Sequence, residues 1–341
     1  MKIKRLLIIT TVCAACLYVC IMQMSFVIAD KSARSCSYSN GLEAVNANKV
    51  ALKYNRYNPL YRLNIGFNYA AVDSLTPDVF QSLINGDSLQ LHYIDSSYAY
   101  MKAAYWMYPE EPVFAVNYAL AEIVKGDTYS AVDALKRYLP VEDNSCELLC
   151  VLGLGYEIIG VFSLASDIYT RVISYFPEVS GSHFFADLQS RDSLMAASII
   201  DGAIDNLHAQ FEKTEDPIVA AKLGKLLFET GDIDKAEEYL LRAVGDLPSL
   251  NRPWYYLGLI KEMKGKEEEA LTYYKRSYSL DNSDILPLSK MVSCGEPYQD
   301  LLDYLVQNKM SNQSHRISRL FGGYTLRYPY IVSDLEQYFS R

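Results

Sequence analysis

Two adjacent stretches of the sequence decide the fold. Pro217–Leu250 reads PIVAAKLGKLLFETGDIDKAEEYLLRAVGDLPSL, and Asn251–Asp284 reads NRPWYYLGLIKEMKGKEEEALTYYKRSYSLDNSD. Self-similarity at a fixed period is the signature of a repeat array. Aligned without a gap, the two stretches share four anchor positions that lie 34 residues apart: Leu223 and Leu257, Gly224 and Gly258, Gly231 and Gly265, and Ala236 and Ala270.

The same anchors recur upstream. Cys146–Val179 carries Gly153, Gly160 and Ala165 at the matching positions, and Pro112–Ser145 carries a weaker set. These two stretches also abut without a gap. The four stretches together indicate stacked copies of one supersecondary unit, in which each copy packs only on its neighbours.

Each unit is predicted to form two amphipathic helices around a turn. Apolar residues recur at three- and four-residue spacing in both halves of the unit, which is typical of helices with one apolar face. Gly265 ends the first helix of the last unit, because glycine readily adopts the left-handed conformation of a helix terminus. We expect Gly258 and Ala270 to supply the close contact between the two helices, since small side chains let helices approach.

This 34-residue pattern resembles the tetratricopeptide repeat family. The resemblance covers 112–179 and 217–284, and we interpret 180–216 as a degenerate unit. It implies an all-α solenoid of about five to six helical hairpins. The predicted organisation is 1–29 signal anchor or signal peptide, 30–41 tether, 42–111 N-terminal helices and divergent repeats, 112–284 repeat array, and 285–341 C-terminal capping helices.

The N-terminal segment is predicted to enter a membrane. Residues 6–29 carry no charge, and three basic residues precede them. As a helix this segment would be about 36 Å long, which exceeds the roughly 30 Å hydrocarbon core. We therefore expect an uncleaved anchor, with the repeats on the outer side of a bacterial cytoplasmic membrane. Cleavage after Ala29 and lipid attachment at Cys16 stay open as alternatives.

The charge balance excludes some partner classes. The first 29 residues contain three basic residues and no acid, so the remainder holds 29 basic and 41 acidic residues. That acidic excess argues against a nucleic-acid partner, which favours a basic stripe. It also argues against broad contact with anionic lipid headgroups.

No constellation of catalytic or metal-ligating residues emerges from the sequence. The four histidines are scattered, without paired-ligand spacing. Gly153, Gly155 and Gly160 fall at seam and turn positions of a repeat rather than in a dinucleotide fingerprint. We therefore expect no enzymatic activity, no metal and no cofactor.

The resemblance implies that first helices line a concave groove that takes a protein or peptide partner. In the unit that begins at Pro112 the corresponding positions are wholly apolar, and the groove becomes mixed toward the far end of the array. We expect this stripe either to bind a partner or to be covered by another segment. In the last two units, the residues expected to face the partner are Lys225, Phe228, Arg252, Tyr255, Leu259 and Glu262.

The sequence thus predicts a membrane-held scaffold or adaptor that binds another protein. The chain also contains 29 tyrosines, and tyrosine combines apolar contact area with a hydroxyl group. The alternative function is therefore an accessory role in surface polysaccharide assembly, through contact with a glycan or with its enzymes.

Overall fold

The computed structural model describes residues 41–72, 92–140 and 146–306, together with the single positions 23 and 27. Apart from those two positions, the predicted membrane segment 1–29 lies outside the described residues, as do most of the tether and the end of the predicted C-terminal cap. Within the described part of the chain, no helix is both long and apolar enough to cross a membrane.

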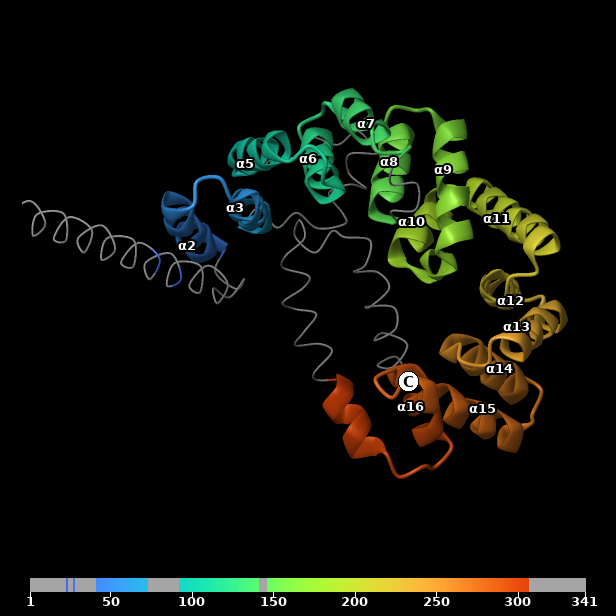
Figure 1. Cartoon of the computed structure of the whole chain (residues 1–341). Helices are drawn as coiled ribbons and strands as arrows, with labels where there is room; N and C mark the ends of the chain where they lie inside the picture. The colour runs from blue at the N-terminus through green and yellow to red at the C-terminus, as the bar shows by residue number, and fades with distance from the viewer. Residues whose placement is uncertain (1–22, 24–26, 28–40, 73–91, 141–145, 307–341) are drawn as a thin grey trace, which may run out of the picture. The chain divides into compact units, whose positions relative to one another are not determined.

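The described residues form helices and connecting turns, without a strand among them (Figure 1). The prediction of an all-helical repeat fold is thereby confirmed. The helices belong to two compact units. The first unit contains α2 (Gly41–Tyr54), α3 (Pro59–Val72), α5 (Ile94–Met107), α6 (Pro112–Val124) and α7 (Thr128–Lys136). The second contains α8 (Cys146–Ile158), α9 (Phe162–Tyr175), the 3₁₀ helix η1 (Pro177–Gly181), α10 (His183–Arg191), α11 (Ser193–Thr214), α12 (Pro217–Thr230), α13 (Ile233–Asp246), α14 (Asn251–Met263), α15 (Glu267–Leu280) and α16 (Ile285–Ser293).

The four clear repeats lie in the predicted register. Their first helices, α6, α8, α12 and α14, begin at Pro112, Cys146, Pro217 and Asn251, the residues at which the repeats were expected to begin. Each of these helices packs against the helix that follows it. In the second unit the hairpins also pack in sequence, through α9 with α11, α11 with α12, and α13 with α14. Packing between neighbours is what defines a repeat array.

A left-handed glycine ends the first helix of every clear repeat. A residue with a Cβ atom is disfavoured in that conformation by roughly 1–2 kcal/mol. In two repeats the next residue is an aspartate, Asp127 or Asp232, whose carboxylate accepts a backbone N–H of the second helix and so caps it. The glycines, with φ between 72° and 87°, are Gly126, Gly160, Gly231 and Gly265.

The less regular segments continue the same construction. In the predicted degenerate unit, Asp192 caps the long helix α11, and α10 and η1 precede it. Beyond the last predicted repeat, α16 is followed by a helical segment at 299–306. Leu302 and Val306 of that segment pack against Ile285 and Leu288 of α16. The described part of the predicted C-terminal cap is therefore a further helical pair.

The seam glycines lie against large side chains of the second helix. A Cβ atom at Gly258 would lie 2.4 Å from the Tyr274 ring. Gly153 faces the Tyr169 ring in the same way, at 2.2 Å. The glycine makes room for a large side chain of the second helix, because a phenol ring fills more of the seam than two small residues would.

We predict that Gly258→Ala destabilises the protein by about 1–3 kcal/mol, because the new methyl group overpacks the seam against Tyr274. Gly245→Ala is the matched control. Gly245 also lies in a helix, but a Cβ atom there has no neighbour within 4 Å. That substitution should be neutral or stabilising by up to about 1 kcal/mol. Urea denaturation of both variants measures the difference, and equal stabilities would contradict the assigned packing.

Candidate partner-binding face

Two predicted partner-facing residues lie side by side with a third that was not predicted. Lys225 and Phe228 project from α12, and Tyr256 projects from the neighbouring α14. The rings of Phe228 and Tyr256 are 5.5 Å apart between centroids, and the Lys225 ammonium lies 5.9 Å from the Tyr256 ring centroid. Leu259 follows Tyr256 by three residues on α14, which places the two on the same side of that helix. We call Lys225, Phe228, Tyr256 and Leu259 the α12–α14 ledge. All four are half-buried.

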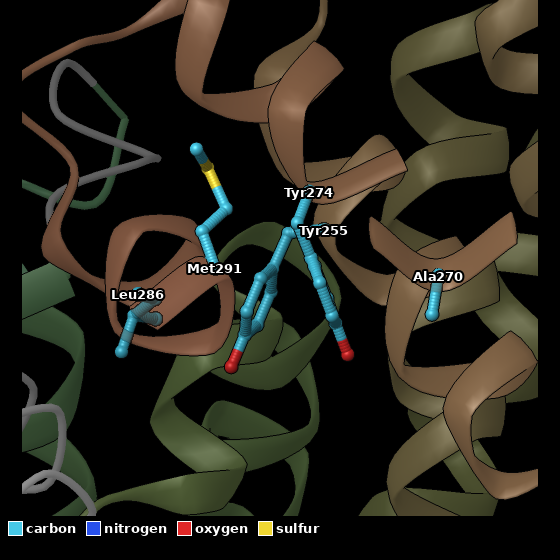
Figure 2. Close-up of a cluster of buried hydrophobic side chains, with 5 residues drawn as sticks. All are labelled: Tyr255, Ala270, Tyr274, Leu286 and Met291. Carbon is cyan, nitrogen blue, oxygen red and sulfur yellow. The ribbon is translucent and has the colours of Figure 1, made fainter. Parts of the chain in front are cut away.

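Tyr255, by contrast, is a packing residue. It is only 6% exposed and packs with Leu286 and Met291 of α16. Figure 2 shows its ring beside that of Tyr274, at a centroid distance of 5.9 Å. The prediction that Tyr255 faces a partner is corrected here, because α16 extends the packing past the last predicted repeat and covers this position.

Glu262 connects three helices. Its carboxylate accepts a hydrogen bond from the Tyr274 hydroxyl at 2.5 Å, and the Lys290 ammonium of α16 lies 2.8 Å from Oε2 and 3.0 Å from Oε1. The Lys290 side chain is only 7% exposed, and burial of an ammonium group without a counter-charge is costly. Burial and the Glu262 carboxylate raise the pKa of Tyr274 far above its ordinary value, which keeps the phenol a hydrogen-bond donor.

The α8–α9 repeat contains the same arrangement. Tyr169 donates to Glu157 at 3.1 Å, and Arg191 of α10 donates to the same carboxylate at 2.8 Å. Burial and the nearby carboxylate raise the pKa of Tyr169 as well. Counted from the start of each repeat, both glutamates occupy position 12 and both tyrosines position 24. Each of these two repeats is thus connected to a later helix through a glutamate–tyrosine–cation cluster.

The α12–α13 repeat lacks this cluster, which explains the ledge. Its position 12 is Phe228 and its position 24 is Leu240, so neither a carboxylate nor a phenol is present. Gly224 accommodates the Leu240 side chain in place of a ring. With no polar partner across the seam, the Phe228 ring lies against Tyr256 of the next repeat instead.

The charges around the ledge are paired within the protein. Lys225 binds Glu229 at 2.6 Å and the Pro177 carbonyl oxygen of η1 at 3.0 Å, while Ser180 donates to Glu229. At the other end, Arg252 pairs with Asp284 at 3.2 Å. The ledge therefore presents aromatic and apolar side chains, while the charges beside it are satisfied within the chain.

Most of the predicted apolar stripe is buried. On α6, Val116, Leu120 and Ile123 are buried whereas Val113 is 39% exposed, and on α8 Cys150 and Leu154 are buried. In the parts of the chain that the structure describes, no group of three histidine, cysteine or acidic residues is arranged to hold a metal ion.

Comparison with known proteins identifies related repeats. The family model described as Tetratricopeptide repeat matches residues 219–245 and 252–284. Tetratricopeptide repeat protein 8 of Caenorhabditis elegans is 28% identical over 173 residues, which cover 49% of this chain and 33% of that protein. The chain thus spans about a third of the length of this curated relative.

Solved structures give a weaker likeness. A crystal structure of MamA is 15% identical over 65% of this chain and 97% of that chain, with a TM-score of 0.23. YrrB, described as a tetratricopeptide-repeat protein with an unusual peptide-binding site, is 17% identical over 55% of this chain and 95% of its own, with a TM-score of 0.30.

We predict that Glu262→Ala destabilises the protein by about 1–2 kcal/mol, because it leaves the Lys290 ammonium buried without a counter-charge. This is less than the roughly 3–5 kcal/mol typical of a fully buried pair, since water screens the partly exposed Glu262.

A double-mutant cycle measured by urea denaturation isolates the pair. The double variant Glu262→Ala, Lys290→Met should lose less stability than the sum of the losses of the two single variants. Strict additivity would show that the two side chains do not interact.

Proposed function

Because this chain is a tetratricopeptide-repeat protein, we propose that it is a non-enzymatic scaffold that binds a peptide segment of a partner protein on the α12–α14 ledge. Proteins built from these repeats are generally protein-binding scaffolds. The ledge lies within the residues that match the family model, on the first helices of two successive repeats.

The observation that carries the proposal is the half-buried aromatic pair of Phe228 and Tyr256 beside the Lys225 ammonium. Aromatic side chains dominate the binding energy of many protein interfaces. The rings of Phe228 and Tyr256 stay half-buried because the α12–α13 repeat lacks the glutamate–tyrosine–cation cluster. The nearby charges are neutralised within the chain, so the partner segment is expected to present an apolar or aromatic side chain.

We also propose that the repeats lie on the outer side of a bacterial cytoplasmic membrane. The support is the uncharged stretch 6–29 behind a basic N-terminus. Alkaline phosphatase requires disulfides, which form outside the cytoplasm. A fusion of this enzyme after Arg341 should therefore be active in a bacterial host, and an inactive fusion of normal abundance would contradict this location.

A polysaccharide-assembly role receives less support from the side chains. The argument for that alternative was the tyrosine content of the chain, and Tyr255 was the tyrosine among the residues expected to face a partner. Tyr255 is buried against Leu286 and Met291, so it presents no ring face to a glycan.

Site-specific photo-crosslinking tests the ledge. A photoreactive amino acid at Tyr256 should capture a discrete partner in cells, whereas the same probe at Leu241, an exposed residue of the second helix α13, should not. Adding Phe228→Ala to the Tyr256 probe should reduce capture by about tenfold or more.

Leu241→Ala in the Tyr256-probe background is the matched control and should leave capture unchanged. Equal capture from the two probe positions, or capture insensitive to Phe228→Ala, would rule out the ledge as the binding surface.

A further inference from the structure

The first 72 residues carry a charge opposite to that of the rest of the chain. They contain nine basic and two acidic residues, whereas 73–341 contain 23 basic and 39 acidic residues. The α2–α3 pair, Gly41–Val72, holds four of the nine basic residues and a single acid, Glu43 (Figure 1). A charge asymmetry of this kind indicates contact with an anionic surface or polymer.

Apolar side chains are exposed at the same place. Tyr57 and Leu60, at the turn between α2 and α3, are 65% and 54% exposed. Val50 and Tyr54 are also exposed, and their spacing of four residues places them on one face of α2. Scattered exposed hydrophobic residues need no explanation, but four that gather at one helix end mark an interaction surface.

The cations of this edge have no carboxylate partner among the described residues. Arg56 donates to the Tyr57 hydroxyl at 2.6 Å and stacks 4.7 Å from its ring centroid, and Arg62 donates to the Arg56 carbonyl oxygen. Lys53 is exposed beside them. By contrast, Lys225 and Lys290 of the repeat array are held by glutamates. The α2–α3 cations are therefore available to an external anion.

We propose that the α2–α3 edge, formed by Val50, Lys53, Tyr54, Arg56, Tyr57 and Leu60, rests on a membrane surface of anionic phospholipid. Tyrosine rings and the long stems of lysine and arginine suit the headgroup region, where one end of a side chain is apolar and the other is wet. Each lysine or arginine near such a surface strengthens binding by about fivefold. The array as a whole is too acidic for this contact, so it is confined to the edge.

The length of the preceding chain places the edge within reach of a membrane. Only residues 30–40 separate the uncharged stretch 6–29 from the first residue of α2. Eleven residues span at most about 40 Å when fully extended. A nucleic acid would also satisfy the cations, but it would not account for the exposed Val50 and Leu60.

Hydrogen exchange of the full-length chain in lipid vesicles tests the proposal. We expect backbone amides of 50–62 to exchange roughly tenfold more slowly, or slower still, in vesicles that combine phosphatidylcholine with phosphatidylglycerol than in phosphatidylcholine alone. High salt should remove this protection in the unchanged protein, because it screens the attraction. The triple variant Lys53→Glu, Arg56→Glu and Arg62→Glu should also lose it.

The triple variant Lys136→Glu, Arg137→Glu and Lys213→Glu is the matched control. It makes the same change in net charge at exposed positions elsewhere and should keep the protection. Equal exchange in the two lipid mixtures, or protection that survives high salt, would overturn the proposal. Protection by an oligonucleotide in phosphatidylcholine vesicles would also overturn it and assign the edge to nucleic acid.

Discussion

The hydrogen bond from a second-helix tyrosine to a first-helix glutamate is the interaction on which the described second unit depends. Two helices of a hairpin pack through apolar contact alone, but the glutamate also takes a cation from the element that follows. Glu157 receives Arg191 from α10 and Glu262 receives Lys290 from α16. The glutamate carboxylate therefore positions both the second helix of its own hairpin and the helix that supplies the cation.

The ledge exists because one repeat of the second unit departs from this rule. Phe228 and Leu240 stand in place of the glutamate and the tyrosine, so this seam lacks that carboxylate and that phenol. The α12–α13 repeat is joined to α14 in a different way, through Glu237, which binds Lys261 at 2.8 Å and Lys264 at 2.6 Å. Those two lysines lower the pKa of the Glu237 carboxyl. In this repeat the ionic connection to α14 comes from the second helix, α13. The first helix, α12, carries the Phe228 ring instead of a carboxylate.

The local part of this construction could be predicted from the sequence. The turn glycines and the 34-residue spacing fixed the starts of α6, α8, α12 and α14, because helix ends depend on residues close in the chain. The burial of Tyr255 could not be predicted, since it depends on α16, which lacks the repeat pattern. Nor could the pairing of Lys290 with Glu262, which joins residues 28 apart. Tyr256 is half-buried because it packs against the same cluster, which includes Leu286 and Met291 of α16.

The two kinds of glycine impose different limits on how such a repeat can diverge. A turn glycine such as Gly231 has a left-handed backbone but open space around it, so asparagine is an acceptable successor. A seam glycine such as Gly258 has an ordinary helical backbone, yet it can be replaced only if the facing ring shrinks at the same time. In the α6–α7 repeat, Ala119 stands at the position of the seam glycine and Leu135 at the position of the facing ring. Sequence drift in this array is therefore limited at the turns by backbone conformation alone, whereas across the seams it is paired.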